Sequence, residues 1–86
     1  MNPAFDPTKT RYRVLKAVVT HEDESIEGIS MDEIADQLEL SGRPAVHYHV
    51  KHLMQEGLLK KGKTAHRYLR STRRGRRLVE LLEEGK

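Results

Sequence analysis

The stretch SMDEIADQLELSGRPAVHYHVKHLMQEG, Ser30 to Gly57, predicts two short helices joined by a tight turn. Ser30 and Glu33 form an S-x-x-E capping box, in which each side chain can satisfy a backbone amide at a helix start. In the turn, Gly42 tolerates a positive φ, and Pro44 suits the first turn of the following helix. We therefore expect helices over about 31–39 and 44–56. Apolar residues recur with helical spacing on both sides of the turn, at Ile34, Leu38, Leu40, Val46, Val50 and Leu53.

The second of these helices has a face suited to nucleic acid. Residues 44–56 contain no carboxylate before Glu56, and the side opposite the apolar stripe is rich in hydrogen-bonding groups. Such a helix can lie in the major groove of DNA without charge repulsion. The preceding helix has an acidic outer face, so we expect it to support the second helix. The expected DNA contacts here are Ser41, Arg43, His47, Tyr48, Lys51 and His52, with Ser41 and the first backbone amides holding a phosphate.

Residues 58–70 predict a β-hairpin, because two short strand-like runs flank a loop that contains Gly62. The hairpin is strongly basic. Its expected partner is the phosphate backbone of DNA or an adjacent minor groove. The residues expected to anchor it there are Lys61, Lys63 and Arg67, within a basic set completed by Lys60, His66 and Arg70.

Two further helices flank this unit. The first is expected from Pro7, after Asp6 as N-cap, to about Thr20, with its basic residues on the solvent side. An acidic loop over residues 21–27, HEDESIE, and a short strand at Gly28–Ile29 should follow it. The last helix, about 72–84, begins after a capping Ser71 or Thr72. Its apolar residues are expected to pack on the first helix, on a second copy of the chain, or on both; they are Leu78, Val79, Leu81 and Leu82.

Charge is distributed unevenly along the chain. Residues 1–40 carry four Lys/Arg and nine Asp/Glu (net −5), whereas residues 41–86 carry twelve and four (net +8). This asymmetry is typical of a protein with one phosphate-facing side, although a solvated basic surface would give the same count. Four arginines crowd the first turns of the last helix, against the helix dipole. Either bound phosphate relieves that conflict, or the arginines pair with the acidic N-terminal part, within the chain or across a dimer. They are Arg73, Arg74, Arg76 and Arg77.

Length and composition limit the alternatives. Eighty-six residues predict one small domain, which dimerisation could stabilise, and the absence of cysteine excludes disulfides and thiolate metal sites. No apolar run approaches membrane-spanning length, and the start MNPAFDPTKT does not resemble a signal peptide, so a cytoplasmic protein is expected. No catalytic triad or phosphate-binding glycine loop is present, so we expect neither an enzyme nor a bound cofactor.

The cluster of histidines suggests a metal site, but its spacing does not favour one. His49 and His52 can share a helix face, whereas His47 points elsewhere, and no carboxylate completes the set. We expect these histidines to donate hydrogen bonds to DNA, with His49 partly buried. Because histidine titrates near neutral pH, DNA affinity is expected to rise as the pH falls.

The spacing of a set of positions within about 8–70 matches that of a known family; they are Ile34-Ala35, Leu38, Ala45-Val46, His49-Val50-Lys51, Leu53 and Gly57-Leu58. This pattern resembles the winged helix-turn-helix DNA-binding domain of the LexA repressor family. The last helix opens S-T-x-x-G-[RK] and is similar instead to the segment after the wing in MarR- and PadR-type regulators. At the start of the second helix the side chains differ in type from those of LexA, and no self-cleaving serine/lysine domain is present. The resemblance therefore implies a stand-alone regulator of bacterial, archaeal or viral origin with its own operator.

The sequence thus predicts one mostly helical α+β domain over residues 1–86, a winged helix-turn-helix with a three-helix core, a hairpin wing and a fourth, C-terminal helix. The helix-turn-helix should span about 31–56, the wing about 58–70 and the last helix about 72–84. The expected function is sequence-specific binding of double-stranded DNA as a transcriptional regulator, with repression as the expected mode, by a homodimer that could form through the C-terminal helix. The alternative is a winged-helix protein-interaction module without specific DNA binding. Neither a metal nor a small-molecule ligand is expected.

Overall fold

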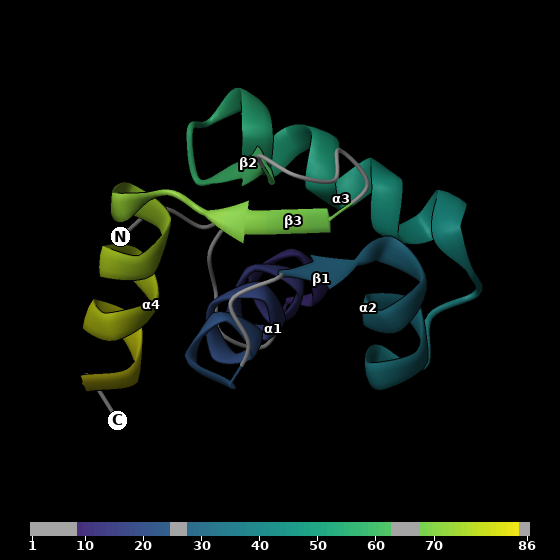
Figure 1. Ribbon diagram of the computed structural model, residues 1–86, viewed down its shortest axis with the longest axis horizontal. Helices are drawn as coiled ribbons and strands as arrows, with labels where there is room; N and C mark the ends of the chain where they lie inside the picture. Colours follow the sequence, from purple (N-terminus) through teal and green to yellow (C-terminus); the bar gives the residue numbers. More distant parts are fainter. Residues whose placement is uncertain (1–8, 25–27, 63–67, 85–86) are drawn as a thin grey trace.

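The computed structural model describes residues 9–24, 28–62 and 68–84. In these ranges the chain forms four helices and a three-stranded antiparallel sheet, which confirms the predicted α+β, mostly helical class (Figure 1). The order of elements is α1 (Thr10–Glu24), β1 (Ile29–Ser30), α2 (Met31–Leu38), α3 (Arg43–Gln55), β2 (Leu59–Lys61), β3 (Tyr68–Ser71) and α4 (Arg73–Glu84).

The sheet has the order β1–β3–β2, so the last strand lies between the other two. Ile29 is opposite Leu69 on one side of β3, and Lys60 is opposite Arg70 on the other. Both the predicted short strand near Ile29 and the two strands of the predicted hairpin are therefore confirmed. The hairpin loop, residues 63–67, lies outside the described part. In Figure 1, α3 and β2 lie above β3 and α1 lies below it.

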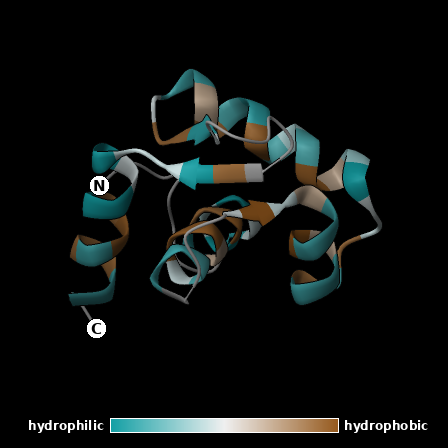
Figure 2. Ribbon diagram, in the orientation of Figure 1, coloured by the Kyte–Doolittle hydropathy of each residue, from teal (hydrophilic) through white to brown (hydrophobic). Residues whose placement is uncertain are grey.

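The core consists of the apolar stripes that the sequence periodicity predicts. Val14, Leu15 and Val18 of α1 are completely buried, and they meet apolar residues of α2, α3 and the sheet. Figure 2 shows these hydrophobic positions as the brown inner sides of the helices. Burial of each such side chain contributes about 1.5–3 kcal/mol relative to exposure. The other aliphatic residues with at most 1% of their surface exposed are Ile29, Ile34, Val46, Val50, Leu53 and Leu69.

Local capping interactions set the ends of α2. The Glu33 amide donates to Ser30 Oγ at 3.2 Å, as the capping box predicts. The reciprocal contact differs, because Glu33 Oε1 accepts from the Ser30 hydroxyl at 3.3 Å and not from its amide. At the other end Glu39 adopts a left-handed conformation (φ 55°), and the amide of Leu40 donates to the carbonyl of Ala35 at 2.9 Å. This closing hydrogen bond ends the helix before the turn.

Gly57 ends α3 as predicted. With φ at 75°, it reverses the chain so that the amide of Leu58 donates to the carbonyl of Leu53 at 2.9 Å, while its own amide donates to Met54 at 3.0 Å. This pair of bonds is a Schellman motif, which favours glycine at the left-handed position. It turns the chain directly from α3 into β2.

The predicted acidic loop over residues 21–27 is wrong in its first half, because α1 continues as helix to Glu24. The reason lies in contacts with residues far along the chain. The side chain of Glu22 is only 5% exposed and accepts hydrogen bonds from Ser71 and Arg76, which hold the last helical turn in place. The predicted helix start near Pro7 lies outside the described residues; the first helical residue that the structure describes is Thr10.

The last helix docks closely against the end of α3. The Thr72 hydroxyl donates to the carbonyl of Gly57 at 2.6 Å and accepts from the amide of Gly75 at 3.0 Å, so Thr72 is the residue that caps α4. A β-carbon on Gly75 would lie 2.1 Å from the Leu58 carbonyl oxygen, which explains why glycine stands there. The inner face of α4 packs against α1, where Tyr12 donates to Glu83 at 2.7 Å.

Candidate nucleic-acid interface

The outer face of α3 presents most of the predicted DNA contacts to solvent. Val46, Val50 and Leu53 are buried on the opposite face, which fixes the helix rotation. Because thirteen residues of α3 include no carboxylate, the exposed face has no group that would repel phosphate. Of the contacts predicted on α3 and in the turn before it, His52 is half-buried, and the exposed ones are Ser41, Arg43, His47, Tyr48 and Lys51.

Tyr48 is the most prominent side chain of this face. It is 57% exposed, yet its ring is held by neighbours: the His52 ring lies edge-on with centroids 4.9 Å apart, and the His49 ring lies 5.3 Å away. The guanidinium of Arg11 lies over the ring at 5.8 Å from its centroid. A cation in this position is attracted by the ring electrons, so these contacts favour one orientation of the Tyr48 ring.

Arg11 is a residue of this surface that the sequence did not reveal. Helical projection places it on the solvent side of α1, whereas the structure finds it half-buried beside α3. No local pattern could have identified it, because the contact with Tyr48 depends on how α1 and α3 pack. Its position adds a cation to a face that the sequence assigns only to α3.

His49 lies half-buried behind Tyr48, as predicted. Its Nδ1 atom is buried without a hydrogen-bond partner among the residues that the structure describes. Burial, followed by the charges of Arg11 and His52, lowers the pKa of His49 below its ordinary value. The ring is therefore neutral at physiological pH. In the described part of the chain, no three or more histidine or acidic side chains come together in a way that could hold a metal ion.

The start of α3 is open to an anion. Gly42 is the N-cap residue, with φ at 117°, and among the described residues no side-chain hydrogen bond caps the helix. Because Pro44 has no N–H, the amides that are open to an anion are those of Arg43 and Ala45. These amides carry the positive end of the helix dipole. Arg43 stands beside them, and it is bound to Asp32 of α2 by two hydrogen bonds of 2.7 and 3.3 Å. Hydrogen bonding to Asp32 raises the pKa of Arg43.

The ion pair of Arg43 and Asp32 connects the start of α3 to α2, the helix with the acidic outer face. Both side chains are 64% exposed, so water and salt screen their attraction. An arginine of this kind can exchange a carboxylate for a phosphate without leaving a buried charge unpaired. Asp32 therefore orients Arg43 beside the start of α3. Because the ion pair is exposed, it can break when a phosphate binds Arg43.

The hairpin extends the basic surface from the end of α3. Lys60 and Lys61 are exposed on β2, which follows α3 through the turn at Gly57. Arg70 on β3 is half-buried and lies 3.9 Å from the carboxylate of Glu22. Lys63 and Arg67, which the sequence places in the wing, lie outside the described residues, and their roles stay predictions.

The arginines of α4 divide into two groups. Arg76 binds Glu22 and Asp23, each at 3.0 Å, so the acidic N-terminal part does pair with one of the four within the chain. The other three, Arg73, Arg74 and Arg77, are exposed and take part in no ion pair in the ranges that the structure covers.

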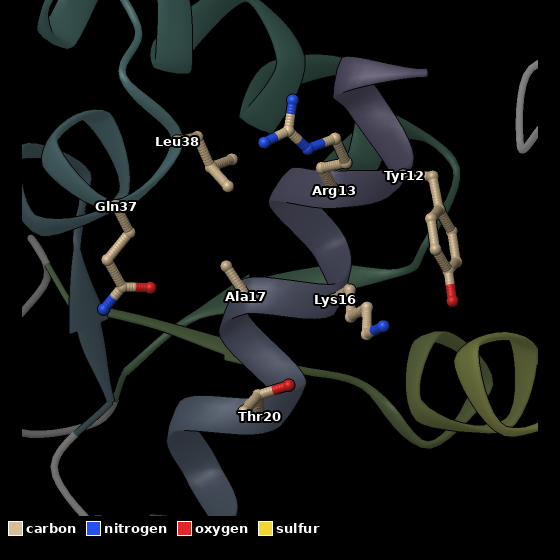
Figure 3. A pocket seen from close by; sticks show the side chains of 7 residues that line it. All are labelled: Tyr12, Arg13, Lys16, Ala17, Thr20, Gln37 and Leu38. Carbon is tan, nitrogen blue, oxygen red and sulfur yellow. The ribbon is translucent and has the colours of Figure 1, made fainter. Parts of the chain in front are cut away.

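A groove of about 410 Å³ lies between α1 and α2 (Figure 3). Gln37 and Leu38 of α2 face Ala17 and Thr20 of α1 across it, whereas Tyr12 points toward α4. Arg13 and Lys16 complete the lining, which holds no carboxylate and no histidine.

No helix in the described ranges is both long and apolar enough to cross a membrane. What the protein does must be inferred from its own residues, because a scan against protein-family models, a search of curated proteins and a search of solved structures each found no match.

Proposed function

We propose that this chain is a winged-helix transcriptional regulator that binds double-stranded DNA sequence-specifically, with α3 in the major groove. The observation that carries the proposal is the outer face of α3. It is exposed, free of carboxylates, rich in hydrogen-bonding side chains and anchored from behind by a fully buried apolar stripe. All four properties suit a helix that reads base edges in the major groove.

The order of the elements supports the same proposal. Three helices, the third following the second after a short turn, are succeeded by an antiparallel hairpin whose second strand also pairs with β1. In a winged helix the third helix enters the groove while the hairpin reaches the backbone beside it. The exposed Lys60 and Lys61 extend the positive surface from α3 in that direction.

Each part of the surface has a role in this proposal. His47, Tyr48 and Lys51 face the base edges, where a lysine can bind O6 and N7 of guanine. Ser41 and the open amides at the start of α3 hold a phosphate, which Arg43 reaches after leaving Asp32. His52 supports Tyr48, and Lys61, with Lys63 and Arg67, anchors the wing on the backbone.

Selection from random duplex DNA with the purified protein, at two salt concentrations, tests the proposal. Enrichment of a defined motif, retained less well at the higher salt concentration, is the expected result. The matched pair is Lys51→Gln and Arg13→Gln: each removes one positive charge, but only Lys51 lies on α3. Lys51→Gln should change the enriched motif or abolish enrichment, whereas Arg13→Gln should leave the motif unchanged.

Two results would refute the proposal. If no motif were enriched and no DNA retained, the surface of α3 would instead serve as a protein-interaction face. If both variants lowered retention equally and the wild type enriched no motif, binding would be a general effect of net charge.

A further inference from the structure

Arg11 of α1 carries a charge that the described part of the chain does not match. It is half-buried beside α3, it takes part in no ion pair within the described residues, and its Nε–H is buried there without an acceptor. By contrast, Arg43 is paired with Asp32 and Arg76 with Glu22. A cation that is partly removed from water is unfavourable unless a counter-charge compensates it. The missing counter-charge of Arg11 is one that a bound anion could supply.

The contact that Arg11 makes is with Tyr48. Its guanidinium carbon lies 5.8 Å from the centroid of the Tyr48 ring, and 57% of Tyr48 is exposed, so Arg11 lies at the border of the outer face of α3. A guanidinium is planar, so it can rest its face on a ring while its N–H groups donate in its own plane. Of its three nitrogens, Nε is the one that is buried without a partner in the described part of the chain. The two terminal nitrogens are left to meet a ligand that arrives over the outer face of α3.

We propose that Arg11 belongs to the DNA interface, where its terminal N–H groups bind a backbone phosphate while its planar face holds the Tyr48 ring. The inference rests on the DNA-binding function proposed above. Arginine matches a phosphate with two parallel hydrogen bonds, and DNA presents phosphates along both edges of the groove that α3 enters. The first helix, α1, thereby becomes a third contributor to the interface, beside α3 and the hairpin.

The two contacts of Arg11 join the backbone of DNA to the residue that reads a base. Phosphate contacts fix the register of a protein on DNA, and base contacts read the sequence within that register. Because Arg11 contacts both the phosphate and Tyr48, the ring is held at a set distance from the backbone. Arg11 is thus a backbone contact and also a positioning residue for Tyr48. Lys61 differs, since it lies on β2 and anchors the backbone alone.

Two substitutions of Arg11 separate these roles, with binding measured on the selected DNA motif and on its single-base-pair variants at several salt concentrations. Arg11→Gln removes both the charge and the planar cation. It should lower the slope of log affinity against log salt by about one unit and reduce the preference at the base pair that Tyr48 contacts by about fivefold or more. Arg11→Lys keeps the charge, but its ammonium group cannot lie flat on the ring. It should keep the slope and lose part of the preference.

Arg13→Gln is the matched control, because Arg13 also lies on α1, is exposed and carries the same charge. It should leave both the slope and the preference as in the wild type. A double-mutant cycle isolates the contact with the ring: in the Arg11→Gln background, Tyr48→Leu should cost less preference than it does in the wild type. Thermal unfolding followed by circular dichroism shows whether each variant is folded at the temperature of the binding measurement. If Arg11→Gln is not folded, Arg11→Lys carries the test, since it keeps the charge and most of the aliphatic stem.

The outcomes separate this inference from the DNA-binding proposal. If the wild type selects a motif but Arg11→Gln matches Arg13→Gln in slope and preference, Arg11 makes no DNA contact, and the proposed function stands without it. If Arg11→Lys keeps the full preference and the cycle shows no coupling, Arg11 does not position Tyr48, and the inference is likewise overturned. If the wild type selects no motif, the DNA-binding proposal itself fails, and this inference fails with it before any variant is compared.

Discussion

The carboxylate of Glu22 lies 3.0 Å from the guanidinium of Arg76, although the two residues are 54 positions apart in the sequence. The side chain of Glu22 is 5% exposed and also accepts hydrogen bonds from the amide and hydroxyl of Ser71. Hydrogen bonding to Glu22 raises the pKa of Arg76, against a smaller opposing effect of burial. The end of α1, the end of β3 and the start of α4 are thereby joined at one carboxylate.

Replacing Glu22 by glutamine should destabilise the protein by about 1.5–3 kcal/mol, the range for a hydrogen bond to a charged group. The amide keeps the shape of the side chain but leaves Arg76 without its buried counter-charge and offers an NH₂ group where Ser71 donates. Urea unfolding followed by circular dichroism measures the change. Asp23→Asn is the control: Asp23 also binds Arg76 but is 64% exposed, so its loss should cost at most about 1 kcal/mol. Equal effects of the two substitutions would contradict a special role for Glu22.

Replacing Gly75 by alanine should destabilise the protein by about 1–3 kcal/mol, because the added methyl group meets the Leu58 carbonyl oxygen at 2.1 Å and α4 must move outward. Alanine otherwise has a higher helix propensity than glycine. A stabilising result would therefore show that α4 does not pack this closely against Leu58. Thermal unfolding provides the measurement. Arg74→Ala, one position earlier and exposed, should change stability by less than about 0.5 kcal/mol.

The half-buried His49 should make stability fall at acidic pH. Its pKa in the folded protein lies below the ordinary value of 6.5, so the unfolded chain takes up the proton first as the pH decreases. Stability is therefore fully present above about pH 6.5 and is lost as the pH falls toward the folded-state pKa. Unfolding by urea at several pH values should show a smaller acid loss for His49→Gln than for the wild type.

A second variant checks the cause of this pH dependence. The charge of Arg11 contributes to the lowered pKa of His49, after burial. Arg11→Gln should therefore reduce the acid loss of stability without removing it. If His49→Gln and the wild type lost stability in parallel, the buried ring would not be the group responsible.

The hairpin and the outer face of α3 should respond differently to mutation. Lys61→Gln should lower the slope of the logarithm of DNA affinity against the logarithm of salt concentration by about one unit and leave the preferred sequence intact, as for a phosphate contact. Binding titrations over a range of salt concentrations measure the slope.

His47 and Tyr48 should instead determine which sequences bind. Replacing either by alanine should change the motif obtained in a DNA selection, with a loss of about 1–3 kcal/mol of discrimination at the affected base pair. An unchanged motif in both variants would place the base contacts elsewhere on the chain. Thr20→Ala, on the far end of α1, serves as the unaffected comparison.

The sequence by itself determined the elements whose signals are local. The cap at Ser30, the left-handed glycine at Gly57 and the apolar periodicity between them predict α2 and α3 to within about one residue, because each signal acts over a single helical turn. The alternation around the Gly62 loop likewise predicts the two paired strands, and the charge asymmetry predicts a basic side.

Tertiary structure decided the features that depend on residues far apart in the chain. It extended α1 through Glu22, selected Arg76 among four similar arginines as its partner, placed Arg11 over Tyr48 and required glycine at position 75. None of these leaves a local pattern, since each arises from the distance between two packed elements. Periodicity shows which face of a helix is buried, but only the packed fold shows which side chain that face meets.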